Sequence, residues 1–487
     1  MMKKYINIII VAVFSLTSCA QWLNVDSPDR ILEDKLYGDR EGFYTALNGV
    51  YIDLVNSSLY SGTLGPSVPD ILAQYYDTSV DSHMSGSLAQ YQAESKRLAV
   101  SDTWSRAYYL ILNINKIIEQ ADIRKGSVLN ELDYSLIKGE ALALRAMLHF
   151  ELFRYFAPSY STAPAAKAIP YATSADPQVY PLLKSSEIVT MLKTDMNESM
   201  RLLKEHDPVI TEGKKEFDNG GRNLYNYRNL RMNYFAVKAL AARVNMYLGY
   251  TYRQEALGLA EEVIRDAAKF FPFSTRDEVT GQAAVGAVTA SAQDRILSSD
   301  VLFSVYNVRR GEDIYEKWFS NTLEVKQLLA ISDNGYKNMY PEEGDLRTYQ
   351  WQRKKDALGN DIMCMVKYEA MEVAGKNYPY MIPVLRLSEM YLIAAECYAG
   401  VDDQKAYQML NVLRNARQTS SVSSSLEMHI ENEYIREFLG EGQLFWFYKR
   451  KNMESITPLY DRSRPVVNMD SSYYVFELPQ SEGGYRE

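Results

Sequence analysis

Apolar residues recur at helical spacing along most of the chain. The segment 104–122 carries one such stripe, formed by Tyr108, Ile111, Asn115 and Ile118. The segment 131–158 carries another, formed by Leu136, Leu144, Leu148 and Phe156, and Pro158 follows its last turn. Residues repeating every three or four positions predict amphipathic helices, and a proline beyond the pattern predicts a helix end. The two segments therefore predict a pair of antiparallel helices.

A second pair of helices is expected further along the chain. The segment 186–204 predicts one helix, and the segment 232–248 begins the next. Between them, residues 213–229 are rich in glycine, asparagine and charged side chains, which predicts an exposed loop.

Two stretches resemble each other within the chain. Tyr247, Gly249, Ala256 and Ala260 have nearly the same spacing as Tyr398, Gly400, Ala406 and Leu410. Small residues where two helices cross, with an aromatic ring one turn away, are typical of tetratricopeptide repeats. Because the copies are not in tandem at about 34 residues, the pattern predicts a mainly α protein with an interrupted helical scaffold.

The helical pattern weakens in the region 267–383. Two stretches there, 299–310 and 361–371, alternate more like strands, and Gly, Ser, Asn and Asp separate the rest. Long irregular segments on a rigid scaffold commonly carry binding function. We therefore expect a single domain over 19–487 with a repeat-rich half (19–266), a loop-rich insertion (267–383) and a C-terminal repeat with a closing segment (384–487).

The N-terminus has the features of an export signal. Lys3 and Lys4 precede an apolar run, 6–16, that is shorter than the roughly 20 residues needed to span a bilayer. Residues 1–18 are therefore predicted to be a signal peptide. The LTS sequence directly before Cys19 resembles a bacterial lipobox, so we expect Cys19 to carry lipid and to tether the chain to a membrane.

Charge and cysteine content exclude two classes of protein. The formal net charge is −9, and the chain has no basic arm, which argues against a nucleic-acid partner. Besides Cys19 only Cys364 and Cys397 are present, so the chain is no disulfide scaffold. A bridge between these two stays open, although Cys397 lies in a helical pattern that favours a buried thiol.

Motifs of common enzymes and metal sites are missing. No two of the four histidines have metal-ligand spacing, and HExxH, paired CxxC, GxSxG and phosphate-loop motifs do not occur. His149, next to Phe150, is predicted to be structural. The acidic stretches 311–316 and 341–347 are interpreted as solvated loops rather than paired catalytic carboxylates. We expect no enzyme, no cofactor and no metal.

Aromatic residues in loops are the strongest candidates for ligand contacts among the 38 tyrosines and 5 tryptophans. A flat ring beside polar groups can stack on a sugar while its neighbours hydrogen-bond the hydroxyls, although such rings also cover hydrophobic patches for packing reasons alone. Stacking is assigned to Tyr75, Tyr76, Tyr91, Tyr306 and Trp318, and orientation of polar groups to Asp77 and Arg309.

Several blocks, in order, resemble the SusD/RagB-like outer-membrane nutrient-binding lipoproteins of Bacteroidetes. After the lipobox come WLNVDSP and ALNGVY, then GEALALRAMLHFELFRYFAP, PVLRLSEMYLIAAECYAG, ENEYIREFLGEGQLFWFYKR and YVFELPQSE. RYFAPSYSTAP replaces the usual FG-x-VP, and FWFYKR replaces the commoner aromatic-Asp-Leu-Lys-Arg, which we expect to alter local packing only. The acid nearest the lipid cysteine is Asp26, so the sequence supports lipidation more firmly than display on the cell surface.

The resemblance implies four interrupted tetratricopeptide-like helix pairs supporting a loop-rich ligand face with short strands. It also implies a noncatalytic lipoprotein on the outer membrane, facing the exterior. Such a protein binds an oligosaccharide or polysaccharide and delivers it to a SusC-like TonB-dependent transporter. The ligand-binding aromatics of the family lie in variable loops, so they cannot be transferred to residues of this chain. The alternative is a lipid-anchored tetratricopeptide-like scaffold that binds only protein or peptide partners.

Overall fold

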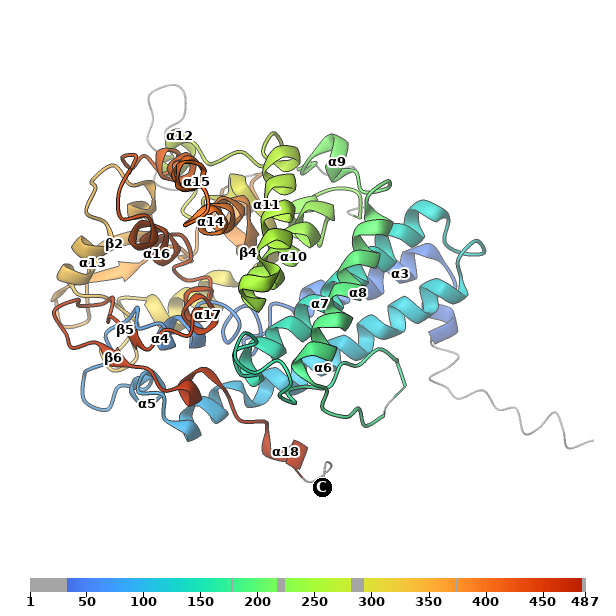
Figure 1. Cartoon of the computed structure of the whole chain (residues 1–487), viewed down its shortest axis with the longest axis horizontal. Coiled ribbons are helices and arrows are strands. Elements are labelled where there is room, and N and C mark those ends of the chain that lie inside the picture. Colours follow the sequence, from blue (N-terminus) through green and yellow to red (C-terminus); the bar gives the residue numbers. More distant parts are fainter. Residues whose placement is uncertain (1–32, 177, 217–223, 282–292, 374, 484–487) are drawn as a thin grey trace, which may run out of the picture.

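Helices make up most of the molecule in the computed structural model (Figure 1). The structure describes residues 33–176, 178–216, 224–281, 293–373 and 375–483. The predicted signal peptide and Cys19 lie outside the described residues. Within them no helix is both long enough and apolar enough to cross a bilayer.

The α-helices of the described part are α3 (Arg40–Asp53), α4 (Val68–Leu72), α5 (Gly86–Ala89), α6 (Ala93–Ile123), α7 (Glu131–Phe156), α8 (Ser185–Leu203), α9 (Val209–Glu212), α10 (Tyr234–Leu248), α11 (Arg253–Ala267), α12 (Arg276–Thr280), α13 (Asp333–Met339), α14 (Leu387–Tyr398), α15 (Asp403–Ala416), α16 (Leu426–Glu437), α17 (Leu444–Arg450) and α18 (Gln480–Gly483). The strands are β1 (Val301–Tyr306), β2 (Trp351–Lys355), β3 (Asp361–Met365), β4 (Met381–Arg386), β5 (Ser455–Ile456) and β6 (Val467–Asn468), and a π-helix covers Gly311–Phe319.

The long helices form a row of four pairs: α6 packs on α7, α8 on α10, α11 on α14, and α15 on α16. Neighbouring pairs also touch, because α7 contacts α8, α10 contacts α11, and α14 contacts α15. The predicted helices over 104–122, 131–158, 186–204 and 232–248 are therefore confirmed. α11 and α14 meet although the loop-rich region lies between them in sequence, so that region is an insertion in the row.

The internal similarity marks two equivalent turns. Gly249 ends α10 with a φ of +101°, and Gly400 follows α14 with a φ of +76°. An L side chain rarely adopts such angles, so glycine is favoured at both turns. Ala256 and Ala260 beyond the first turn are fully buried, as are Ala406 and Leu410 beyond the second. The spacing shared by the two stretches therefore indicates where neighbouring helices cross.

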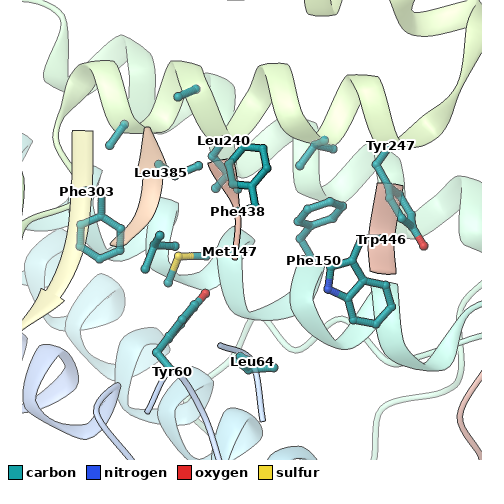
Figure 2. Packing of buried hydrophobic residues seen from close by; sticks show 14 of the residues in the cluster. Tyr60, Leu64, Met147, Phe150, Leu240, Tyr247, Phe303, Leu385, Phe438 and Trp446 are labelled. Atoms are coloured by element: carbon teal, nitrogen blue, oxygen red, sulfur yellow. The ribbon is translucent and has the colours of Figure 1, made fainter. Parts of the chain in front are cut away.

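Helices α7 and α10 form the centre of the molecule. All fifteen residues of α10 are buried, and α7 is buried around nearly its whole circumference. Asn130 and Asn233 cap their N-termini by accepting backbone N–H groups of Asp133 and Ala236 at 2.8 and 3.0 Å. Figure 2 shows residues of α7 and α10 meeting β1, β4 and α17 in one core. The stripes seen in the sequence therefore understate how far these helices are enclosed.

Three two-stranded antiparallel sheets lie in the described residues: β1 with β4, β2 with β3, and β5 with β6. The predicted strands near 301–306 and 361–365 are confirmed. β4 leads directly into α14, so the β1–β4 pairing closes the insertion at its base. Cys364 and Cys397 are both free and buried, which confirms the buried thiol favoured at Cys397.

The segment 341–347 is a solvated loop only in its first part, because Asp345, Leu346 and Arg347 are buried, which corrects the sequence interpretation. The guanidinium of Arg347 and the carboxylate of Asp345 are almost fully enclosed and form a bidentate pair at 2.8 Å. Arg347 also donates to Glu433 of α16 at 2.7 Å. Buried charges require such partners. Glu433 and Glu437 lie 86 and 90 positions from Arg347 in the sequence, so local composition could not reveal these pairs.

Candidate functional site

Three of the predicted stacking residues are enclosed in the core. Tyr75, Tyr76 and Tyr91 are 0, 2 and 4% exposed. Tyr75 Oη donates to the carbonyl of Ile435 at 2.6 Å, and Tyr91 Oη donates to that of Leu72 at 2.5 Å. Their rings cannot stack on a ligand in this structure, so the predicted role is wrong for these three residues.

Asp70 explains why this segment turns inward. Its buried carboxylate, on α4, accepts the backbone N–H groups of Gly440 and Gly442 at 2.6 and 3.1 Å. Burial raises the pKa of Asp70 to about 8, and the two N–H donors oppose that rise. This contact ties α4 to the turn before α17, and the tyrosines that follow α4 are enclosed with it.

Hydrogen bonds and close packing link the segments that carry the other predicted residues. Asp77 N–H donates to Ala330 O, and Leu329 N–H donates to Trp318 O, each at 2.8 Å. Trp318 lies against Gly62, and the neighbouring Ser61 accepts a hydrogen bond from Asn307 at 2.9 Å. Asn307 directly follows Tyr306. The segments of Asp77, Trp318 and Tyr306 are therefore connected, through the buried residues Leu329, Ser61 and Asn307.

Trp318 projects from the π-helix. This kind of helix is rare and occurs often at functional sites. Its first residue, Gly311, sits so close to Ala370 that a Cβ there would lie 2.7 Å from the Ala370 Cβ. The Trp318 ring is half-buried, with the Lys317 ammonium 4.7 Å from its centre. Part of the indole surface is thus available beside a cation.

Arg309 lies just before this helix and forms ion pairs with two carboxylates. Its Nε donates to Glu312 at 3.0 Å, and Nη2 lies 3.4 Å from Asp313. Asp313 also accepts from Asn307 Nδ2 at 3.0 Å. Arg309 can reach a ligand, and its charge is shared with these acids.

A pocket of about 460 Å³ opens beside Tyr306. Its lining combines aromatic, amide, guanidinium and aliphatic groups from α3, from the segment before α10, from β1 and from the segment before β4: Asn48, Tyr51, Ile52, Tyr227, Leu230, Arg231, Tyr306 and Asn377. Concave sites of this size that mix apolar surface with a few fixed polar groups are typical of small-molecule binding.

Hydrogen bonds fix the floor of this pocket. Tyr51 Oη donates to Glu140 at 2.7 Å and accepts the Met232 N–H at 2.9 Å. The Arg231 guanidinium lies 5.1 Å from the centre of the Tyr51 ring and hydrogen-bonds Asn48. Glu140 is fully buried beneath the pocket and also accepts a hydrogen bond from the guanidinium of Arg228. The walls are therefore held in place before any ligand arrives.

Tyr306 is the most accessible ring of the pocket. It is 36% exposed, and the ring of Tyr380 meets its edge with centres 5.4 Å apart. Partial burial, and secondarily Tyr380, raises the pKa of Tyr306, so its hydroxyl stays protonated at neutral pH. One ring face with a neutral hydroxyl suits stacking and hydrogen bonding by the same side chain.

Sequence reasoning missed most of this pocket. Residues 213–229 were expected to form an exposed loop, yet Arg228 and Asn229 are fully buried and Tyr227 lines the pocket. Tyr227 also has a φ of +49°, a strained value for a tyrosine. The sequence signal that could have identified part of the pocket is the block ALNGVY, which places Asn48 and Tyr51 one turn apart on α3.

Metal-ligating side chains do not gather within the described part of the chain. There, no group of three His, Cys, Asp or Glu side chains could hold a metal ion. His149 is enclosed between helices as predicted, with Nδ1 2.9 Å from the Arg145 carbonyl and Nε2 accepting the Ala172 N–H at 3.0 Å. The chemistry offered by the Tyr306 pocket is that of recognition.

Comparison with protein families agrees with this geometry. A SusD-like family described as "Starch-binding associating with outer membrane" matches residues 45–212, and the SusD family model, SusD_RagB, matches residues 316–476. The first match covers α6, α7 and α8, and the second covers the later part of the insertion together with α14, α15, α16 and α17. The chain belongs to the SusD/RagB family.

Relatives of this SusD-family chain are distant in sequence. A SusD-like protein, P25, of Formosa agariphila is 27% identical over 176 residues, which is 32% of each chain. The match therefore spans about a third of that curated relative.

Solved structures agree along nearly the whole length. A SusD superfamily protein of Bacteroides thetaiotaomicron has a TM-score of 0.69 at 20% identity and covers 92% of this chain and 98% of its own. A SusD-like carbohydrate binding protein of Bacteroides vulgatus has a TM-score of 0.68 at 17% identity, with coverage of 92 and 96%. Surface glycan-binding protein A of Bacteroides thetaiotaomicron has a TM-score of 0.65 at 16% identity, with coverage of 92 and 98%. At these identities the likeness establishes the SusD fold.

Proposed function

We propose that this SusD-family chain is a noncatalytic lipoprotein of the cell surface that binds an oligosaccharide or polysaccharide nutrient. The glycan occupies the pocket beside Tyr306 and extends along the face that carries Trp318. The chain then delivers it to a SusC-like TonB-dependent transporter of the outer membrane. Lipid on Cys19 holds the protein at that membrane, with its ligand face directed to the exterior.

The observation that carries this proposal is the composition of the Tyr306 pocket. A half-exposed tyrosine ring, two side-chain amides and one guanidinium converge on about 460 Å³ of space. A pyranose has an apolar C–H face and a rim of hydroxyls, and this pocket offers a partner for each. The family's description as starch-binding points to the same class of ligand.

A single ring cannot give useful affinity. One aromatic contact contributes about 0.5–1.5 kcal/mol, whereas a micromolar complex requires about 8 kcal/mol. The partly exposed ring of Trp318 is a further candidate contact, so a ligand of several sugar units is expected to bind more tightly than a monosaccharide.

Titration calorimetry of the protein lacking residues 1–19 against a panel of oligosaccharides tests the binding step. Tyr306→Ala is expected to weaken binding about tenfold, as loss of one stacking platform implies. Tyr250→Ala is the matched control, since that ring is 82% exposed and lies outside the pocket. Equal affinity in wild-type and Tyr306→Ala protein would show that the glycan binds elsewhere.

Delivery requires a second test in cells. Extraction of the tagged full-length protein in mild detergent is expected to recover a TonB-dependent barrel, and Cys19→Ala is expected to release the protein from the membrane. Recovery of a periplasmic complex with no barrel would favour the scaffold alternative. Shortened glycan products after incubation with purified protein would contradict a noncatalytic role.

A further inference from the structure

A second pocket, of about 420 Å³, lies on the helix row and shares no residue with the Tyr306 pocket. Three parts of the chain build it: one side of α6, the connector between α7 and α8, and the C-terminal segment. Among its lining residues are Trp104, Tyr108, Asn115, Val179, Tyr180 and Glu482.

Hydrogen bonds from α6 hold the connector wall in place. Tyr108 Oη donates to Pro170 O at 2.8 Å, and Asn115 Nδ2 donates to the carbonyls of Ala172 and Ser174 at 3.1 and 3.0 Å. Within the connector, Tyr180 Oη accepts the Ser174 N–H at 2.9 Å. The pocket is therefore formed in advance, which lowers the entropy lost when a ligand binds.

The C-terminal segment supplies another wall, and Lys96 anchors it. The Lys96 ammonium donates to the carbonyls of Ser472, Tyr473 and Val475 at 2.7, 3.3 and 2.8 Å. Tyr473 stacks on Tyr91 with ring centres 4.8 Å apart. Beyond this anchor Glu482 accepts the Trp104 indole N–H at 3.0 Å. Tyr91, predicted to touch ligand directly, thus supports the segment that encloses this pocket.

The lining is mainly apolar and its formal charge is negative. Three aromatic side chains, with Pro170, Leu112 and Val179, supply flat surface, whereas Asp176 and Glu482 are the charged groups among the described lining residues. Carboxylates accept hydrogen bonds from hydroxyls and repel anions. The chemistry suits a neutral sugar and disfavours a uronate. The Tyr306 pocket instead carries Arg231.

We propose that this pocket, formed by α6, the connector and the C-terminal segment, is a second carbohydrate site that binds one neutral pyranose unit. The ring stacks against Tyr108 and Tyr180, and its hydroxyls donate to Glu482 and Asp176. This inference goes beyond the proposed function, because that function places the glycan at Tyr306 and Trp318 and does not use this pocket. Two separate sites on one chain would hold a polysaccharide at two points and raise its effective local concentration.

The indole N–H resonance of Trp104 reports occupancy directly. Protein labelled with ¹⁵N-tryptophan is titrated with maltotetraose, cellotetraose, xylotetraose and mannotetraose, and with tetragalacturonate as the anionic probe. Trp104→Phe assigns the signal. The titrations use a Tyr306→Ala background, which weakens binding at the first pocket, and the Trp104 signal reports on the second pocket because Trp104 lines that pocket alone of the two.

At least one neutral tetraose is expected to shift this resonance, while tetragalacturonate leaves it in place. Tyr180→Ala is expected to weaken the effect about tenfold, through loss of one stacking ring. Val179→Glu should do the same without disturbing the core, because Val179 is 70% exposed. Tyr109→Ala, which removes a half-exposed ring of α6 outside the pocket, is the control and should bind as the background does.

The outcomes separate this site from the first one. No shift with any neutral sugar, equal binding by Tyr180→Ala and Val179→Glu, or tight binding of tetragalacturonate would each overturn the second site. If Tyr306→Ala weakens sugar binding and no sugar shifts the Trp104 resonance, the second site is wrong and the proposed function stands. If a sugar shifts the Trp104 resonance and Tyr306→Ala binds that sugar as tightly as wild-type protein does, the second site stands and the first pocket is wrong.

Discussion

Arg347 and Glu433 form an ion pair closed off from water, with Arg347 Nη1 donating to Glu433 Oε2 at 2.7 Å and both side chains 0% exposed. Arg347 belongs to the insertion and Glu433 to α16, so the pair joins the ligand-bearing region to the last repeat. Glu433 also accepts from Arg414 and Arg436 at 2.6 and 2.8 Å. One carboxylate therefore accepts hydrogen bonds from three guanidinium groups, and Asp345, Glu437 and Glu342 supply further negative charge to Arg347 and Arg414.

Removing that carboxylate should destabilise the fold strongly. Glu433→Gln keeps the shape and leaves three buried cations short of one negative charge, which is expected to cost about 3–5 kcal/mol of unfolding free energy. Chemical denaturation measures the change. Glu198→Gln is the control, because its partner Arg201 is 66% exposed and surface pairs contribute little. Equal stability of the two variants would contradict the structural role given to the pair.

Gly62 should be essential for the position of Trp318. A Cβ at residue 62 would lie 2.1 Å from the Ser57 carbonyl oxygen and 3.2 Å from Trp318 Cη2. Gly62→Ala must therefore shift the backbone or the indole, at a cost of about 1–3 kcal/mol, and should weaken glycan binding. Gly49→Ala, where a Cβ meets open space, should leave both properties intact. Denaturation and calorimetry of both variants check this, and unchanged affinity in Gly62→Ala would place Trp318 outside the site.

Acid should destabilise the protein partly through His149. Burial, which outweighs the hydrogen bond to Arg145 O, lowers the pKa of His149 to about 3 from its ordinary 6.5. The unfolded chain binds this proton below pH 6.5 and the folded chain does not, so stability is full above pH 6.5 and falls as the pH drops toward 3. Within that window the loss is about 1.4 kcal/mol per pH unit.

The matched experiment compares wild type with His149→Gln. Unfolding free energies measured between pH 7 and pH 4 should decline less steeply in the variant, because other titrating groups are common to both proteins. Parallel curves would mean that the folded and unfolded chains bind the His149 proton equally, so that its pKa is not lowered by folding.

Both remaining thiols should resist modification in the native protein. Burial raises the pKa of Cys364 and of Cys397 to about 11, so little reactive thiolate is present at neutral pH. An aromatic disulfide reagent is expected to release no product from native protein lacking Cys19, and to react with both thiols after denaturation. Failure to react when denatured and unreduced would indicate a Cys364–Cys397 bridge.

Sequence patterns predicted the scaffold well and the ligand face poorly. Helix pairs and the glycine turns at 249 and 400 leave a local periodic signal, and so do β1 and β3. The inward or outward direction of a tyrosine in a loop leaves no such local signal. Tyr75 is enclosed because its hydroxyl meets the carbonyl of Ile435, 360 residues further along the chain. Tyr306, with a similar local sequence setting, remains accessible because it ends its strand at the rim of a pocket.

The same limit explains the hidden parts of the candidate site. Arg228 and Arg231 lie in a stretch whose composition is that of a loop, yet both bind Glu140 of α7. Charges that find partners 88 or more positions away look solvated when only neighbours in sequence are considered. Residue spacing can identify a helix face, but the pairing of distant charges requires the fold.

The anchor of the C-terminal segment has a consequence for how the protein is made. Lys96 is only 5% exposed, and its three acceptors lie between Ser472 and Val475, some 376 residues later. Ribosomes and export machinery deliver the N-terminus first, so water solvates this amine until residues 472–475 arrive and cover it. A chain truncated before Ser472 would lose these three hydrogen bonds and the stacking of Tyr473 on Tyr91. The first long helix therefore gains these contacts only when synthesis is nearly complete, and prematurely ended chains are expected to be cleaved more readily by proteases.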